Sequence, residues 1–262
     1  MIFGGKKKLK FINGIHHGSH LDTVCVSQRK GLNLIEDAVL GKYPSKTVEF
    51  EKKKSLGTKR FAYEVVDVPL ADGLSIRVVT RDMEPVTAFP VLEGVKVGVE
   101  VKEVLEWKKW PEANVSGVVP NDYSPAVTFY ATDYMEKKET YLTSENLNVK
   151  LAFLAYTGTA EELQRETTKL PDGKEVIVDL NEAEILLPAK ISLQGAFIDD
   201  YIMTAHVLEL EEVSTPCGDG YVMLLSNEPL GKIRAFVLKE NLAGKIKNGS
   251  SLTLVGWLQG RL

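Results

Sequence analysis

Residues 251–261 read Ser-Leu-Thr-Leu-Val-Gly-Trp-Leu-Gln-Gly-Arg, and the alternation in this stretch decides the fold class. Successive side chains of a β-strand point to opposite faces, so the stretch has two distinct sides. One side carries Leu252, Leu254 and Leu258, which is typical of a face turned toward an apolar core. The other side carries Trp257 and Arg261 among smaller residues. We therefore predict a strand that buries one face and turns the other to solvent.

The same strand signature recurs along most of the chain. Runs rich in β-branched and aromatic residues, separated by turn signals such as Asn248-Gly249, predict strands. These runs lie at residues 61–68, 74–80, 97–107, 126–132, 147–156, 175–180, 201–213, 220–225, 232–238 and 251–258. Apolar residues at helical spacing predict helices only over residues 27–40 and 160–169. The predicted class is all-β with minor α.

Composition indicates a globular protein. The chain has 262 residues, of which 44% are hydrophobic and 26% charged, so it is long enough to bury a sizeable core. No apolar run approaches the roughly 20 residues that cross a bilayer, and the start of the chain lacks the apolar stretch of a secretory signal. We expect a cytoplasmic protein with no membrane partner.

Cys25 and Cys217 lie far apart without a CxxC neighbour, so we expect neither a disulfide framework nor a thiolate metal site.

Two stretches of the chain look like copies of one unit. Three short segments of the first stretch recur in the same order in the second, each about 105 residues further on. The pairs are Val104–Trp107 with Val207–Leu210, Thr128–Tyr130 with Ala235–Val237, and Asn146–Val149 with Ser251–Leu254. Two meanders of strands also align in this way by chance, so duplication and coincidence both remain open.

Residues 242–261 contain a Lys-Asn-Gly-Ser turn followed by a strand that closes on Gly-Trp-Leu-Gln-Gly-Arg. This segment resembles the fourth-strand region of bacterial single-stranded DNA-binding proteins, in which a Lys-Gly-Ser turn leads into a strand ending in Gly-x-Leu-Gln-x-Arg. The resemblance extends loosely back to Tyr201 and implies an OB-fold, a small five-stranded barrel. The chain stops at Leu262, where that family adds its fifth strand. We therefore expect an earlier segment, either Glu184–Leu193 or the first unit, to close this barrel.

Together these observations predict two OB-like β-barrel units preceded by a basic, partly helical N-terminal region. The predicted parts are a basic N-terminal region (1–60), a connecting β segment (61–94), a first OB-like unit (95–160), a linker with a short helix and a strand (161–194), and a second OB-like unit (195–262).

Charge is distributed unevenly between these parts. The formal net charge of the chain is -4, but residues 1–60 carry +8 and the remainder carries -12. Lysine clusters in the first 60 residues could release counterions from a phosphate backbone. They could equally form a solvated face, or dock against the acidic remainder of the same chain.

Aromatic and basic side chains share the outer faces of the predicted strands. A single-stranded nucleic acid needs such a surface, because its bases stack on rings while cations follow its phosphates. We therefore predict a non-catalytic single-stranded nucleic-acid-binding protein. The predicted binding residues are Lys6, Lys7, Lys8, Lys52, Lys53, Lys54, Tyr130, Lys150, Tyr156, Lys232, Arg234, Phe236, Trp257 and Arg261.

The main alternative uses the same residues differently. Outward aromatic and basic side chains also cover a second packed sheet or a subunit interface. The chain would then be a self-assembling or scaffold component of a viral or multisubunit complex. For both functions we expect the chain to form a homo-oligomer or to join a larger protein complex.

Motifs for catalysis or cofactors are incomplete. His16, His17 and His20 lie close together beside Asp22, but no distant ligand pair completes a zinc site. Glu100-Val101-Lys102 matches half of a metal-dependent nuclease site, the third alternative, without the Pro-Asp partner that such a site needs. There is no glycine-rich phosphate loop. We predict no catalytic residue, no metal and no cofactor.

Overall fold

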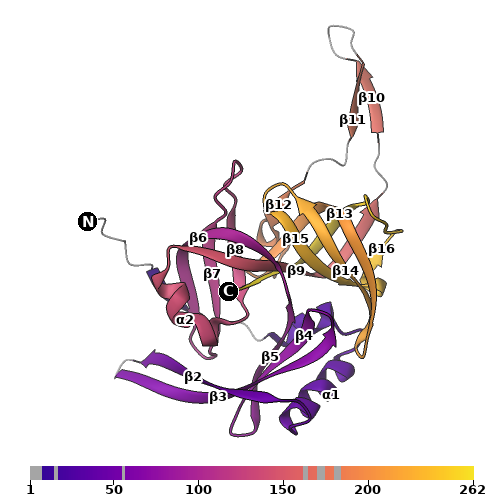
Figure 1. Ribbon diagram of the computed structural model, residues 1–262. Coiled ribbons are helices and arrows are strands. Elements are labelled where there is room, and N and C mark those ends of the chain that lie inside the picture. The colour runs from indigo at the N-terminus through magenta and orange to yellow at the C-terminus, as the bar shows by residue number, and fades with distance from the viewer. Residues whose placement is uncertain (1–7, 15–16, 55–56, 162–164, 170–174, 180–183) are drawn as a thin grey trace, which may run out of the picture.

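The computed structural model describes the whole chain except residues 1–7, 15–16, 55–56, 162–164, 170–174 and 180–183 (Figure 1). Strands dominate the described residues, and the predicted all-β class with minor α is confirmed. Across the described ranges, no helix is both long and apolar enough to span a bilayer.

Five strands, most of them from the middle of the chain, form a closed ring. They are β6 (Val95–Trp107), β7 (Ala113–Val118), β8 (Ala126–Ala131), β9 (Asn146–Glu161) and β17 (Ser251–Arg261), and helix α2 (Tyr134–Thr143) connects β8 to β9. β6 pairs antiparallel with β7 and with β9, and β7 pairs antiparallel with β8. β17 then closes the ring, parallel to β8 and antiparallel to β9. A strand from the far end of the chain thus completes the first ring.

A second ring has the same order of pairing. It contains β13 (Asp200–Thr215), β14 (Gly218–Asn227) and β15 (Gly231–Leu238) together with β17 and β9, and the short elements η3 (Lys239–Asn241) and β16 (Leu242–Ala243) connect β15 to β17. β13 pairs antiparallel with β14 and with β17, and β14 pairs antiparallel with β15. β15 closes the ring by pairing parallel with β9. The first unit therefore supplies the closing strand of the second, one of the two sources expected from the sequence.

The two rings share strands β9 and β17, which pair antiparallel with a bulge between Val255 and Gly256. A Cβ atom on Gly256 would come 2.4 Å from the carbonyl oxygen of Leu154, so the close approach of the strands requires glycine there. Side chains such as Phe153, Leu254 and Ile233 fill one hydrophobic core. The chain can therefore wind both rings around a single pair of strands.

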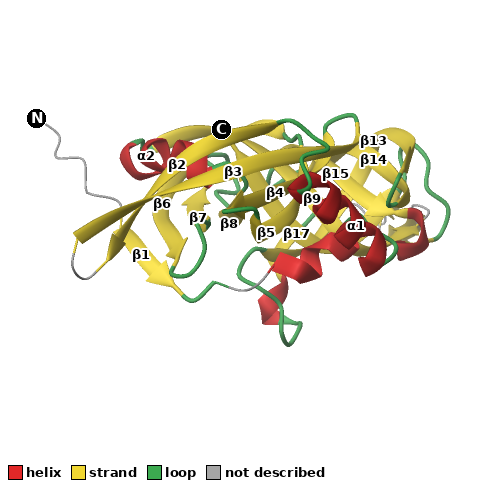
Figure 2. Cartoon of the chain, turned by 90° about the horizontal axis from the view of Figure 1, so that it is seen from below, coloured by secondary structure: helices red, strands yellow, loops and turns green. Residues whose placement is uncertain are grey.

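A four-stranded antiparallel sheet lies across the outside of the rings (Figures 1 and 2). Its strands are β2 (Ser45–Lys54), β3 (Gly57–Ala71), β4 (Leu74–Arg81) and β5 (Glu84–Leu92). Ile76, Val78 and Phe89 belong to a second hydrophobic cluster, which also includes outward-facing residues of the rings. β2 and the start of β3 occupy residues 45–54 and 57–60, where the lysine-rich sequence had suggested no strand.

The N-terminal segment adds strand β1 (Lys8–Ile12) to the edge of β6, followed by η1 (His17–Thr23) and helix α1 (Gln28–Val39). Cys25 forms a disulfide with Cys217, in the turn between β13 and β14. The expectation that the cysteines form no disulfide framework is therefore wrong for this pair. Their separation of 192 residues in sequence becomes 4.4 Å between Cα atoms in the fold, which is a distance that a disulfide can bridge.

The two predicted helices have different outcomes. The helix predicted over residues 27–40 is confirmed as α1. Of the apolar residues whose spacing predicted it, Leu32 and Leu40 are exposed, whereas Gly31 and Ala38 are buried. The helix predicted over residues 160–169 is wrong, because β9 continues to Glu161 and residues 165–169 form a strand.

Two further strands form a hairpin apart from the main sheets. Its strands β10 (Arg165–Lys169) and β11 (Glu175–Asp179) pair with each other in a separate two-stranded sheet. Figure 1 shows this hairpin standing away from the rings. After it, β12 (Leu186–Pro188) pairs with β13 and leads into η2 (Ala189–Ile191), which returns the chain to the main body.

Candidate functional site

The predicted stacking surface is closed to solvent. Trp257 and Phe236 are 0% exposed, and Tyr130 is 1% exposed. The sequence placed these three aromatic side chains on the correct faces of their strands. They point outward, away from the core that the closed rings of strands enclose. Their predicted exposure is wrong, because the four-stranded sheet and the N-terminal segment cover that outer face. The three aromatic side chains thus pack against other parts of the protein, which is what the alternative of a second packed sheet predicted.

Three of the remaining predicted residues contact other parts of the chain. Tyr156 is half-buried and its hydroxyl is hydrogen-bonded, Lys150 forms an ion pair with Glu93, and Arg234 lies 3.9 Å from Asp72. Lys232 is exposed and Arg261 is half-exposed. Lys6 and Lys7 lie outside the described residues, whereas the backbones of Lys8, Lys53 and Lys54 belong to strands β1 and β2. The fold therefore does not gather the predicted set into one surface.

A different basic surface forms where the β2–β3 hairpin meets the loop between β6 and β7. Lys52 donates hydrogen bonds from Nζ to the carbonyl oxygens of Trp107 and Trp110, at 2.8 and 3.0 Å. These bonds hold the hairpin beside Lys108 and Lys109, both of which are exposed. Lys59 lies directly opposite Lys52 in the β2–β3 register. Like charges in opposite positions repel, so an anion between them would be stabilised.

Aromatic rings are interleaved with these lysines. The Nζ atom of Lys109 is 6.0 Å from the ring centroid of Trp110, and that of Lys59 is 5.1 Å from the centroid of Phe61. Both rings are half-buried. We call this surface the basic tip and define it by Lys52, Lys59, Phe61, Lys108, Lys109 and Trp110. It combines cations with partly exposed rings, which the buried outer face does not.

A cavity of about 140 Å³ lies beside Trp107, whose backbone carbonyl accepts a hydrogen bond from Lys52 of the basic tip. Its wall contains the buried polar side chains of His20, Asn114 and Asp199. Trp107 Nε1 donates to Asn114 Oδ1 at 2.8 Å, and Asn114 Nδ2 donates to Asp199 Oδ2 at 2.8 Å. The same carboxylate oxygen accepts a 2.8 Å bond from Trp257 Nε1. Paired polar groups thus hold one wall of the cavity rigidly.

His20 connects this wall to a second polar group. Its ring stacks on Trp257 with 4.2 Å between centroids, and its Nδ1 is 2.7 Å from the hydroxyl of Tyr156. That hydroxyl donates to Asp200 Oδ1 at 2.9 Å. Burial raises the pKa of Tyr156 far above its usual range, and the charge of Asp200 adds to the effect, so the hydroxyl keeps its proton. Burial also raises the pKa of Asp200, against the hydrogen bonds that it accepts.

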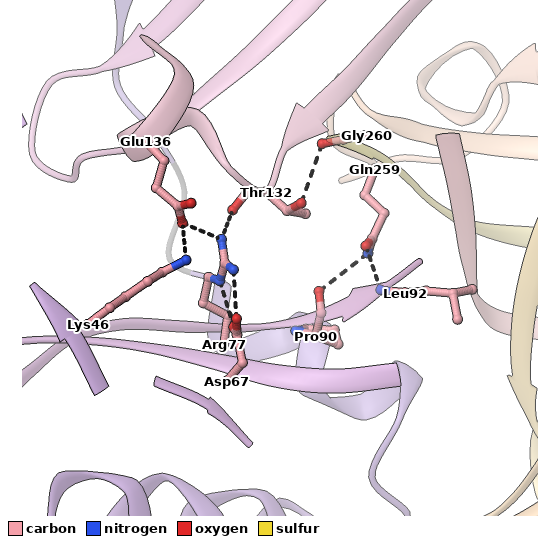
Figure 3. Close-up of polar contacts among 9 residues, drawn as sticks. All are labelled: Lys46, Asp67, Arg77, Pro90, Leu92, Thr132, Glu136, Gln259 and Gly260. Carbon is pink, nitrogen blue, oxygen red and sulfur yellow. Dashed lines mark hydrogen bonds and ion pairs between the residues drawn. The ribbon is translucent and has the colours of Figure 1, made fainter. Parts of the chain in front are cut away.

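Buried polar contacts also hold the four-stranded sheet against the rings (Figure 3). Arg77 of β4 donates two hydrogen bonds to Asp67, one to the carbonyl oxygen of Thr132 and one to Glu136. Gln259 of β17 accepts from the backbone N–H of Leu92 and donates to the carbonyl oxygen of Pro90. These contacts fix the sheet that covers the outer aromatic residues.

The candidate metal and nuclease residues are not assembled into a site. Lys102 forms an ion pair with Glu100 on the surface, and His20 is occupied within the wall of the cavity. His16 lies outside the described residues. Among the residues that are described, no group of three or more His, Cys, Asp and Glu side chains is placed to hold a metal ion.

Sequence reasoning missed the residues that the fold brings together around the cavity. Asn114 and Asp199 are 85 residues apart and follow no motif. The run Lys108-Lys109-Trp110 did carry a local signal, two lysines beside an aromatic residue at the end of a predicted strand.

Comparison with known protein families, with curated proteins and with solved structures found no match to this chain.

Proposed function

We propose that each ring is an OB-like unit whose fifth strand comes from the other unit. In the first ring, β6, β7, β8 and β9 take the places of strands 1 to 4, and α2 lies between strands 3 and 4. In the second ring, β13, β14, β15 and β17 take these places, and η3 lies between strands 3 and 4. In both rings the fifth strand is parallel to the third, and this shared order of pairing supports the proposal. It also supports an origin by duplication.

We further propose that the protein binds single-stranded nucleic acid without catalysis, and that it does so at the basic tip. OB-folds bind oligonucleotides through the face of strands 2 and 3 and through adjoining loops, including the loop between strands 1 and 2. In the first unit that loop carries Lys108, Lys109 and Trp110. The observation that carries this proposal is the pair of hydrogen bonds from Lys52, which join the β2–β3 hairpin to this loop.

The chemistry of the tip suits a strand rather than a duplex. Cations follow the phosphates, while half-exposed rings stack with unpaired bases at about 1–3 kcal/mol per base. The tip is positive although the chain as a whole has a formal net charge of -4, so binding should depend on this local surface.

Charge reversal at the tip should weaken binding to a labelled single-stranded oligonucleotide. We expect the double variant Lys108→Glu/Lys109→Glu to lose about tenfold or more in affinity at low salt, because two phosphate contacts become repulsive. The dependence of log K on log salt should also become less steep, by about 0.7 for each lost contact. Fluorescence anisotropy over a range of salt concentrations measures both quantities.

The matched control is Lys96→Glu/Lys245→Glu, which reverses the same number of exposed charges away from the tip. This control should retain most of the affinity, because only the general electrostatic attraction changes. Equal losses in the two variants would contradict binding at the tip. Absence of any salt-dependent binding by the unmodified protein would reject the proposed function.

The β10–β11 hairpin favours a second candidate, a self-assembling or scaffold component. A two-stranded hairpin is marginally stable by itself, and this one pairs with no other described strand. A partner strand or surface would stabilise it.

Deletion of this hairpin tests the second candidate. If the protein assembles through the hairpin, light scattering should report a mass above the 29.0 kDa monomer, and replacement of residues 163–182 by a short Gly-Ser linker should return it to the monomer mass. A monomer at every concentration, with and without the hairpin, would reject self-assembly by this route. Oligonucleotide binding should not change, because the basic tip belongs to other elements.

A further inference from the structure

A groove of about 270 Å³ crosses the outer face of the second ring, on strands β13, β14 and β15. Glu209, Leu224 and Arg234 lie opposite one another in the register of these strands, so their side chains share one face. Phe236 lies on the same face, two positions after Arg234, and the four-stranded sheet packs over it. The groove is therefore the part of this outer face that the covering sheet leaves open.

The uncompensated charge of the groove is negative. Glu209 and Glu211 are exposed and line the groove, and neither is paired with a cation among the residues that the structure describes. Arg234 also lines the groove, but its guanidinium donates to the backbone carbonyl oxygen of Asp72 and lies 3.9 Å from the Asp72 carboxylate. Two glutamates thus remain beside the half-buried, apolar side chain of Leu224.

This groove lies where an OB-fold binds its ligand, but its charge is wrong for a nucleic acid. In the proposed OB-like arrangement, β14 and β15 are strands 2 and 3 of the second ring, and the face of these strands binds oligonucleotides in OB-folds. Glu209 and Glu211 would repel phosphates there and attract cations. The expected partner is a basic surface with an aromatic side chain that can cover Leu224.

The basic tip has this chemistry. Lys59, Lys108 and Lys109 are exposed, and the half-buried rings of Phe61 and Trp110 lie among them. Aromatic residues are frequent anchors at the centre of protein interfaces, and opposite charges on two surfaces favour and orient their encounter. The tip and the groove are therefore complementary in charge and in apolar content.

The tip and the groove of one molecule lie far from each other. Figures 1 and 2 place the free end of the β2–β3 hairpin at one end of the molecule and strands β13 and β14 toward the other. A contact between tip and groove must therefore join two copies of the chain. Each copy would use two different surfaces, so the contact can repeat from copy to copy and form a ring or a filament.

We propose that the protein associates with itself head to tail, with the basic tip of one copy docked in the groove of a second copy. Lysines of the tip would face Glu209 and Glu211, and the ring of Trp110 would cover Leu224. Neither surface includes the β10–β11 hairpin. The tip is also the proposed nucleic-acid site, so a bound strand would exclude the second copy, and this consequence alone rests on the proposed function.

Light scattering at low salt tests the proposal. The mass of the unmodified protein should exceed the 29.0 kDa of the monomer, rise with protein concentration and fall as added salt screens the charges. The groove variant Glu209→Lys/Glu211→Lys and the tip variant Lys108→Glu/Lys109→Glu should each remain a monomer. A monomeric unmodified protein at every concentration at low salt would overturn the proposal.

A mixture of these two variants separates the proposed interface from loss of folding. The groove variant keeps an intact tip and the tip variant keeps an intact groove, so an equimolar mixture should regain a complex of at least about twice the monomer mass. A mixture that stays monomeric, although circular dichroism shows both variants to be folded, would overturn the proposal.

The matched control is Glu36→Lys/Glu145→Lys, which makes the same change in net charge at two exposed positions outside the groove, in α1 and in the turn before β9. This control should associate as the unmodified protein does. Equal losses in the control and in the groove variant would contradict docking in the groove. Association that survives in the groove variant but is lost on replacement of the β10–β11 hairpin would also overturn this proposal.

A single-stranded oligonucleotide separates this proposal from the proposed function. If both hold, the oligonucleotide should dissociate the assembly, and the groove variant should bind the oligonucleotide as a monomer. Assembly without oligonucleotide binding would support the head-to-tail contact and reject the proposed function. Oligonucleotide binding by a protein that is monomeric at every salt concentration would do the reverse.

Discussion

Replacement of Trp257 by alanine should lower the free energy of unfolding by about 3–5 kcal/mol, because truncation of a fully buried aromatic side chain leaves a cavity that the surroundings fill only partly. Trp257 is 0% exposed, its ring stacks on His20, and its Nε1 donates to Asp199. The variant also removes one donor from a buried carboxylate, which adds to the loss. Urea unfolding followed by circular dichroism measures the change.

Tyr123→Ala provides the matched control for this prediction. Tyr123 is an aromatic residue that is 59% exposed, and its hydroxyl donates a hydrogen bond to Glu228 at the surface. Its truncation should change stability by less than about 0.5 kcal/mol. A Trp257→Ala protein as stable as the Tyr123→Ala protein would show that the ring does not lie in the core. That result would restore the stacking role predicted from the sequence.

Replacement of Arg77 by alanine should also cost about 3–5 kcal/mol, because it leaves the partners of a buried cation without their charge. The side chain of Arg77 is 5% exposed, and its hydrogen bonds reach Asp67 in β3, Thr132 in the turn between β8 and α2, and Glu136 in α2. The loss should loosen the four-stranded sheet from the rings (Figure 3). Hydrogen exchange would detect this as faster exchange of amides in β3 to β5.

Arg60→Ala is the control, since Arg60 forms an ion pair with Glu51 at the surface and its side chain is 72% exposed. Surface ion pairs contribute about 0–1 kcal/mol, so this variant should remain close to the unmodified protein. Similar losses from Arg60→Ala and Arg77→Ala would contradict the structural role of Arg77.

The ion pair between Arg77 and Asp67 should also make the stability of the protein depend on pH. Burial tends to raise the pKa of Asp67, but the hydrogen bonds and charge of Arg77 outweigh it and lower the pKa below its ordinary value of 3.8. A carboxyl whose pKa is lower in the folded state stabilises the fold above its unfolded pKa and loses that contribution as pH falls through the folded one. The stability difference between the unmodified protein and Arg77→Ala should therefore narrow below about pH 4. A constant difference down to pH 2 would contradict this coupling.

The missed helix α2 shows where local patterns were too weak. Its buried side includes two tyrosines, Tyr134 and Tyr141, and the rest of its ten residues are mainly charged or polar. These tyrosines lie seven positions apart, a spacing compatible with one helical face. Met135 and Leu142 also pack against the core, but so short a segment depends on tertiary packing, and its sequence alone gives little indication of helix.

Residues 160–169 were misassigned for a related reason. The run Ala160-Glu161-Glu162-Leu163-Gln164 is rich in good helix formers. Its first two residues nevertheless belong to β9, which pairs with β17 up to Glu161. Pairing with a distant strand overrides local propensity, and the partner lies 90 residues further along the chain.

The alternation of side chains by itself determined the class of the protein and the two faces of strands such as β17. It placed Leu254 toward the core and Trp257 on the opposite side, as the structure has them. Alternation depends only on backbone geometry, so a single strand is enough to reveal it.

Only the tertiary structure decided what lies on the outer face. An outer face is polar or aromatic whether water, a ligand or another sheet covers it, and the covering sheet β2 to β5 lies more than 150 residues earlier in the chain than Trp257. The Cys25–Cys217 disulfide, the exchange of closing strands between the two rings and the cavity beside Trp107 are likewise products of distant segments meeting. Contacts of this kind depend on the packing of whole elements, which no local pattern of residues records.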